Sequence, residues 1–184
     1  MARQEVVIGG FGGQGIILAG FILGQAAIFD GKNATFAQDY GPEARGGACR
    51  AQLVISDSQI SYPYVEAPSL VAVMSQEAYA KYTAGLSKDA PLLIDQDLVK
   101  PRRSQGQRIF AIRATHTAGE LGRSAVANIV MLGFLTAFGR TVSAEAVKQS
   151  LLRSVPKGTE ELNMKAFERG YSEGIAQLSA GETR

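Results

Sequence analysis

The chain has 184 residues, which is the size of one domain with one hydrophobic core. Hydrophobic residues make up 46% and charged residues 20%, a composition that excludes a disordered protein. The formal net charge is only +2, which argues against a general nucleic-acid-binding surface.

The sequence contains one cysteine, Cys49, and one histidine, His116. Iron–sulfur clusters that take four cysteines and histidine-rich metal sites are therefore excluded for this chain alone. The N-terminus lacks the basic and apolar regions of a signal peptide. Two apolar stretches, residues 16–29 and 125–138, are shorter than the roughly 18 residues of a membrane span. We expect a cytoplasmic protein that does not enter a membrane.

In chain order, the first predicted element is a buried strand over residues 5–10, an apolar run that ends in glycines. The stretch 16–29 predicts a helix that is apolar on every side and must be covered on more than one face. A second strand is expected at residues 34–38, followed by a loop rich in glycine and proline at 39–47. From Cys49 onwards apolar and polar residues alternate, as in a half-buried strand.

The second half of the chain continues the alternation of strands and helices. Strands are expected at 70–74, 91–95 and 109–112, and helices at 77–86 and 125–138. Two further helices are expected near the C-terminus, the first capped by Ser143 and the second by Thr159. The sequence therefore predicts an α/β fold, a mostly parallel twisted sheet with helices on both faces. This Rossmann-like arrangement is expected to form a single domain over residues 1–184.

Glycines at positions 10, 12 and 15 match the spacing G-x-G-x-x-G between the first strand and the first helix. Such a turn lets backbone N–H groups approach a phosphate at a helix N-terminus. An NAD site also needs an acidic residue after the second strand, and the only candidate, Asp39, comes late. Close packing of strand and helix explains the glycines equally well, but the polar Gln14 favours an anion site.

The loop at residues 40–47 contains the second candidate group. In a parallel sheet it would lie at the carboxyl edge beside the glycine turn, where such folds bind ligands. Arg45, next to Gly46, is suited to clamp an anion or anchor an interface, and Glu43 could orient it. The alternative is a simple turn with a surface ion pair.

The remaining polar candidates are weaker. Asn128 is expected to be a satisfied core amide and His116 a cap or surface residue. Arg102, Arg103 and Arg108 are best explained as a solvated loop. No nucleophile, base and orienting group can be combined from these residues, so we expect no catalytic residue and no metal site in this chain.

Taken together, the segments 10–15 and 40–47, the strand ending at 54–57, and Asn128 with Gly133 resemble the gamma subunit, or gamma domain, of the 2-oxoacid:ferredoxin oxidoreductases. The resemblance runs nearly end to end. It implies a multi-subunit enzyme that oxidatively decarboxylates a 2-oxoacid, transfers the acyl group to coenzyme A and passes electrons to ferredoxin. Thiamine diphosphate and iron–sulfur clusters would then reside in partner subunits.

The same resemblance implies that this chain holds no cofactor alone, assists assembly and contacts coenzyme A. Its partners would be alpha and beta subunits, with a ferredoxin-like delta subunit as a further candidate, and ferredoxin as the electron acceptor of the complex. The residues expected to contact the cofactor or a partner are Gly12, Gly13, Gln14, Gly15, Glu43, Arg45 and Gly46.

The segment 40–49 looks most like the 2-oxoglutarate enzymes, with pyruvate, branched-chain oxoacids and indolepyruvate as alternative substrates. The two apolar helices independently predict a large interface, because one small sheet gives them too little cover. From the residues alone, a stand-alone nucleotide-binding protein or NAD-dependent dehydrogenase is the alternative function.

Overall fold

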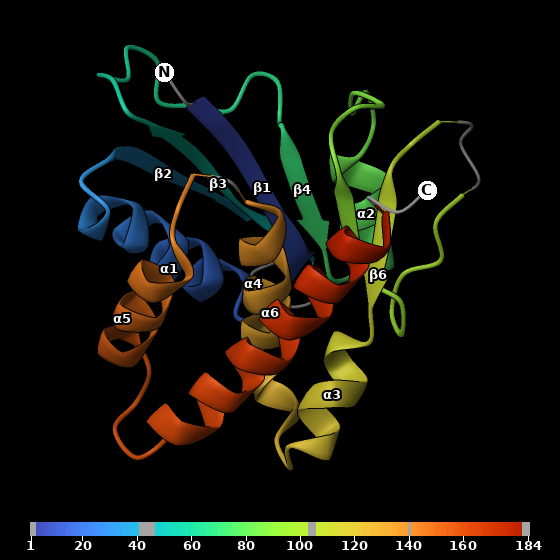
Figure 1. Ribbon diagram of the computed structural model, residues 1–184. Helices are drawn as coiled ribbons and strands as arrows, with labels where there is room; N and C mark the ends of the chain where they lie inside the picture. The colour runs from blue at the N-terminus through green and yellow to red at the C-terminus, as the bar shows by residue number, and fades with distance from the viewer. Residues whose placement is uncertain (1–2, 41–46, 103–105, 140, 182–184) are drawn as a thin grey trace.

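The computed structural model describes residues 3–40, 47–102, 106–139 and 141–181, and a six-stranded sheet crosses the molecule (Figure 1). The strand order is β2-β3-β1-β4-β5-β6. The strands are β1 (Arg3–Phe11), β2 (Asn33–Tyr40), β3 (Ala48–Ser56), β4 (Leu70–Val73), β5 (Leu92–Asp95) and β6 (Ile109–Ile112). Strands β1, β4, β5 and β6 pair in parallel, whereas β3 is antiparallel to both β1 and β2. The predicted mostly parallel sheet is confirmed.

Strand β3 is the exception because its connection to β2 spans only residues 41–47. A parallel crossover needs a dozen or more residues, so such a short connection leaves only an antiparallel hairpin. Since β1 and β2 are both antiparallel to β3, they run in the same direction and end at the same edge of the sheet.

The helices cover the two faces of the sheet unequally (Figure 1). The main core packs α1, α4, α5 and α6 on one face, and a smaller core holds α2 on the other. The helices are α1 (Ile16–Phe29), α2 (Gln76–Tyr82), α3 (Ala114–Glu120), α4 (Ala127–Phe138), α5 (Ala144–Ser154) and α6 (Glu160–Gly181). Helices on both faces are as predicted. Helix α3 was not predicted, and α2 is shorter than expected.

Helix α4 lies against α6 with almost no space between the two backbones. A Cβ atom at Gly170 would overlap the backbone carbonyl of Val130, and one at Gly133 would overlap that of Phe167. Along α4 all residues but Ala137 are buried. The expectation that this helix needs cover from another subunit is therefore wrong, because α6 of the same chain supplies it.

Helix α1 differs, since part of its apolar surface stays exposed. Phe21 is 48% exposed and Ile28 is 56% exposed. Phe21 contacts Phe36 of the edge strand β2 edge-to-face, with ring centroids 6.4 Å apart. Of the two apolar helices from which an interface is predicted, α1 therefore keeps large apolar side chains exposed, whereas α4 does not. No helix in the described part of the chain is long and apolar enough to cross a membrane.

The predicted cap of α5 is confirmed, because the Ser143 hydroxyl accepts a hydrogen bond from the Ala146 N–H at 3.2 Å. That hydroxyl also donates to Asp30 at the end of α1, at 2.8 Å. Thr159 precedes α6, but its hydroxyl accepts from the side-chain amide of Asn163, at 3.0 Å, and donates to the Pro156 carbonyl. Capping of a backbone N–H by the Thr159 side chain is therefore not observed.

Candidate functional site

The glycine turn joins the end of β1 to the start of α1 at the carboxyl edge of the sheet. Gly13 and Gly15 have φ angles of +103° and +73°, which L side chains rarely adopt. A Cβ at Gly15 would also overlap the side-chain amide of Asn128. The turn therefore needs glycine for its own conformation as well as for close packing.

Gln14 is held inside the turn by backbone groups. Its Oε1 accepts a hydrogen bond from the Phe11 N–H at 2.6 Å, and its Nε2 donates to the Met74 carbonyl at 3.0 Å. Met74 directly follows β4, the parallel neighbour of β1. Gln14 thus links the turn to the end of the adjacent strand, a role that its position in the sequence did not disclose.

The residues that flank the second predicted group lie beside the same turn. Glu43, Arg45 and Gly46 lie outside the described residues. The N–H of Gly12 donates to the carbonyl of Gly47 at 3.1 Å, directly after that segment. The flanks of the loop, the end of β2 and the start of β3, therefore stand at the edge where β1 ends.

Asn128, at the start of α4, provides the third link to the turn. Its Nδ2 donates to the Gly15 carbonyl at 3.0 Å. Asn128 is 3% exposed, and its Oδ1 is buried without a hydrogen-bond partner within the described ranges. The sequence predicted a satisfied core amide, which is wrong for this oxygen. A buried acceptor of this kind is a signal that only coordinates reveal.

Asp39 does not have the surroundings of a ribose-binding residue. Its Oδ2 accepts hydrogen bonds from Arg50 Nε at 2.6 Å and from Gln52 Nε2 at 2.9 Å. Strand β3 also separates β2 from β1, whereas a dinucleotide-binding fold places its second strand beside the first. Both observations weaken the NAD-binding alternative.

Several titratable groups form none of the hydrogen bonds that hold the turn. The buried Asp95, at the end of β5, accepts hydrogen bonds from the N–H and hydroxyl of Thr115. Burial raises the pKa of its carboxyl, partly offset by these bonds. His116 is an exposed residue of α3, as predicted. Arg102 and Arg108 are exposed as well, while Arg103 lies outside the described residues.

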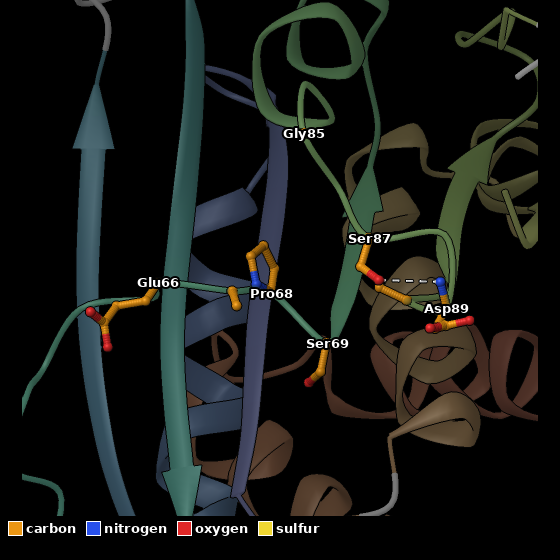
Figure 2. A pocket seen from close by; sticks show the side chains of 8 residues that line it. Glu66, Pro68, Ser69, Gly85, Ser87 and Asp89 are labelled. Carbon is orange, nitrogen blue, oxygen red and sulfur yellow. Dashed lines mark hydrogen bonds between the residues drawn. The ribbon is translucent and has the colours of Figure 1, made fainter.

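A second site is a cavity of about 390 Å³ whose lining includes Glu66, Ser69, Ser87 and Asp89. Figure 2 shows these side chains. The cavity lies at the amino edge of β4 and β5, because Ser69 directly precedes β4 and Asp89 comes shortly before β5. Ligands of open α/β sheets bind at the carboxyl edge, so we do not assign this cavity. Among the described residues no cluster of three or more His, Cys, Asp or Glu could hold a metal ion.

The chain is similar in sequence to known proteins. Residues 5–173 match the family model described as pyruvate ferredoxin/flavodoxin oxidoreductase. The 2-oxoglutarate synthase subunit KorC of Methanocaldococcus jannaschii is 47% identical over 173 residues, which cover 92% of each chain. The pyruvate synthase subunit PorC of the same organism is 31% identical, with 92% of this chain and 96% of the relative covered.

Two solved structures share the fold. One is the gamma subunit of keto/oxoacid ferredoxin oxidoreductase from Geobacter sulfurreducens PCA, with a TM-score of 0.84, 41% identity, and coverage of 94% of this chain and 99% of that chain. The other is 2-oxoglutarate:ferredoxin oxidoreductase from Magnetococcus marinus with 2-oxoglutarate, coenzyme A and succinyl-CoA bound. Its TM-score is 0.85 at 20% identity, and the similarity covers 96% of this chain but 32% of that one.

Proposed function

Because the chain belongs to the pyruvate ferredoxin/flavodoxin oxidoreductase family, we propose that it is the gamma subunit of a 2-oxoglutarate:ferredoxin oxidoreductase, in which it helps to bind coenzyme A. The complex would decarboxylate 2-oxoglutarate, join the remaining acyl group to coenzyme A and pass the released electrons to ferredoxin. Thiamine diphosphate and the iron–sulfur clusters would be held by the alpha, beta and ferredoxin-like delta subunits.

The substrate is proposed by comparing the sequence identity of this chain to two related subunits from the same organism, Methanocaldococcus jannaschii. Identity to the 2-oxoglutarate synthase subunit is 47%, against 31% for the pyruvate synthase subunit. The larger share of common residues favours a 2-oxoglutarate enzyme over a pyruvate enzyme.

The observation that carries the proposed role is the glycine turn itself, fixed at the N-terminus of a 14-residue helix. The first N–H groups of a helix have no partner within it and form the positive end of its dipole, so they attract phosphate. Coenzyme A supplies such phosphates. Gly12, Gly13 and Gly15 would let the backbone approach the anion, and Gln14 would keep the turn in shape.

Arg45, with Glu43 and Gly46 beside it, is the proposed second contact. A guanidinium pairs with phosphate or carboxylate through two parallel hydrogen bonds, and either a phosphate of coenzyme A or a partner carboxylate would fit this chemistry. The apolar surface of α1 at Phe21 and Ile28 is the proposed site of subunit association.

The test is to co-express the chain with alpha, beta and delta subunits and to measure ferredoxin reduction that depends on 2-oxoglutarate and coenzyme A. We expect one complex whose activity requires this chain, and Arg45→Ala is expected to raise KM for coenzyme A or loosen assembly. The exposed Arg169 of α6 provides the matched control, Arg169→Ala.

Two results would overturn the proposal. One is a monomeric chain whose removal leaves the other subunits fully active. The other is tight NAD binding with turnover by the isolated chain, which would establish the dehydrogenase alternative.

A further inference from the structure

The two edges of the sheet, β6 and β2, are protected to different degrees (Figure 1). Strand β6 has only four residues, and the carbonyl of its Ala111 accepts a hydrogen bond from the Gln177 side chain at 2.8 Å. Strand β2 has eight residues, without proline, lysine or arginine, and its continuous register with β3 contains no bulge. Natural edge strands use such devices because an open edge pairs with other chains. Strand β2 lacks them.

The hydrogen-bond pattern determines which backbone groups of β2 point out of the sheet. The Gly12 N–H donates to the Gly47 carbonyl, and these two residues continue the register of β1 with β3. Because successive residues of a strand bond to opposite sides, odd-numbered residues of β3 bond to β1 and even-numbered ones to β2. By the register of β2 with β3, the odd-numbered residues of β2 then bond to β3. The outward N–H and C=O groups belong to Ala34, Phe36, Gln38 and Tyr40.

These outward groups have no hydrogen-bond partner within the described ranges. The one loop contact of the strand is a bond from the Thr35 hydroxyl to the Pro63 carbonyl, at 2.7 Å. Thr35 alternates with Phe36, so this contact lies on the face away from α1 and uses no outward group. A row of backbone N–H and C=O groups is matched by another extended backbone, as in strand addition to a sheet edge.

Apolar side chains stand beside this edge on the face that α1 covers. Phe36 of β2 is exposed and contacts the exposed Phe21 of α1. Ile28 follows Phe21 by about two helical turns, so it is exposed on the same side of α1. Gly20 lets α1 lie close to the sheet, because a Cβ there would stand 2.5 Å from the Ala51 Cβ. The open edge and the apolar side of α1 thus adjoin each other.

The arrangement of the outward residues favours a second copy of this chain as the partner. Two copies of β2 related by a two-fold axis would run antiparallel. With Ala37 opposite the Ala37 of the second copy, Ala34 stands opposite Tyr40 and Phe36 opposite Gln38. Every outward residue then meets an outward residue. The central pair is not hydrogen-bonded, and its Cα atoms approach to about 4.5 Å, which suits alanine.

Charge does not oppose this pairing. Asp39 is the one charged residue of β2, and its carboxylate is bonded to Arg50 of β3 at 2.6 Å. In the same register it stands opposite Thr35 of the second copy, so no like charges meet. The two-fold axis would also place both α1 helices on one face of the joined sheet, with the apolar sides beside the axis.

We propose that β2 pairs with β2 of a second copy of this chain, so that two sheets join across a two-fold interface to which α1 contributes Phe21 and Ile28. The inference rests on the proposed function in one respect, the association of subunits at α1, and deepens it by naming the partner. A strand from a different subunit is an alternative occupant that the experiment distinguishes.

The experiment is sedimentation equilibrium of the full chain, which measures the dissociation constant of the dimer. Gln38→Pro removes one outward N–H but no hydrogen bond to β3, and edge strands accept proline at such positions. Each dimer loses two hydrogen bonds, so its Kd should rise roughly five- to 150-fold. The matched control is Gln38→Ala, which also removes the side-chain amide but keeps the backbone N–H, and it should remain dimeric.

A second variant tests the interface without altering the strand. Phe21→Lys would bring two like charges together beside the axis and should favour the monomer, whereas Leu152→Lys on the exposed side of α5 should not. Circular dichroism establishes that each variant folds. Hydrogen exchange followed by NMR locates the contact, because the amides of Ala34, Phe36 and Gln38 should exchange slowly in the dimer and fast in the Phe21→Lys monomer.

Three results would overturn the inference: a monomer at every concentration, a dimer that folded Gln38→Pro does not weaken, or fast exchange of the three amides within a dimer. Slow exchange that arises only after other subunits are added would also overturn it and would identify one of them as the occupant. Failure of the proposed function is distinguishable. An active complex whose copies of this chain do not pair rejects the inference alone, and a dimer that joins no complex rejects the function alone.

Discussion

Gln14 and Met74 are linked by a 3.0 Å hydrogen bond from the Gln14 side-chain amide to the Met74 carbonyl. A second bond, from the Met74 N–H to the Gly9 carbonyl at 2.8 Å, joins the same two strand ends. The turn after β1 is thus anchored to the end of β4. An anion at this turn would meet backbone groups already held in place, which reduces the entropic cost of binding.

Gln14→Ala is predicted to destabilise the chain by about 1–3 kcal/mol, because the Phe11 N–H and the Met74 carbonyl both lose a partner. Gln14→Glu keeps the acceptor for Phe11 but places a carboxylate against the Met74 carbonyl, so it should also destabilise. Urea unfolding measures the stability of both Gln14 variants. The control is Gln38→Ala on the exposed edge of β2, and equal midpoints for all three variants would contradict this role.

Gly170→Ala is predicted to destabilise the fold by about 1–3 kcal/mol, since the new methyl group would overlap the backbone of α4. Gly119→Ala in α3 is the matched control, because its Cβ meets nothing within 4 Å. A helical glycine in open space should gain up to about 1 kcal/mol on changing to alanine. Thermal unfolding of the two variants should therefore shift in opposite directions, and a shared direction would refute the close packing.

Asp95 predicts a pH dependence of stability. Burial raises the pKa of its carboxyl above the ordinary 3.8, although Thr115 and the Asp97 backbone donate hydrogen bonds to it. The folded state therefore binds this proton more tightly than the unfolded state. Its contribution to stability is largest below pH 3.8 and falls as the pH rises through the raised pKa.

Thr115→Val should raise the pKa of Asp95 further by removing one donor to the carboxylate. The free energy of unfolding of this variant is expected to fall by about 1.5–3 kcal/mol at neutral pH, and by less in acid, where the carboxyl is protonated. Denaturant unfolding at several pH values gives this difference. Thr117→Val in the same helix should leave the pH dependence unchanged, and a loss for Thr115→Val that is constant with pH would rule out the linkage.

Ser143→Ala is predicted to cost about 1–2 kcal/mol, because the hydroxyl caps α5 and also donates to Asp30. Ser143→Thr keeps the hydroxyl and should cost less. Chemical denaturation of the pair checks this, and equal stability of the alanine variant and the unmodified chain would show that the cap is dispensable.

Much of the fold could be predicted from local patterns. Apolar runs and glycines located the six strands, and the range 16–29 for the first helix agrees with α1. Helix α3 was missed because it is short and carries no apolar stripe. Its first turn is held instead by hydrogen bonds that the N–H groups of Thr115 and His116 donate to the carboxylates of Asp95 and Asp97. The antiparallel direction of β3 was missed because the length of the loop between β2 and β3, which decides that direction, was not considered.

For the candidate site, sequence reasoning identified the turn but not how its side chains are used. Gln14 was interpreted as a ligand contact, yet its two polar atoms bond to Phe11 and Met74. Asn128 lies 113 positions from Gly15, and no local pattern indicates their contact. Residue spacing reports periodicity within an element, whereas partners across the fold depend on tertiary packing.

The pairing of α4 with α6 has a consequence for how the chain is made. Synthesis from the N-terminus releases α4 from the ribosome before α6, with α5 in between. Until α6 docks, the apolar side of α4 that it covers remains open to water, and exposed apolar surface of this kind promotes aggregation. The nascent chain should therefore engage chaperones at α4, and variants that slow the docking of α6 should lower the soluble yield even where the finished fold is unchanged.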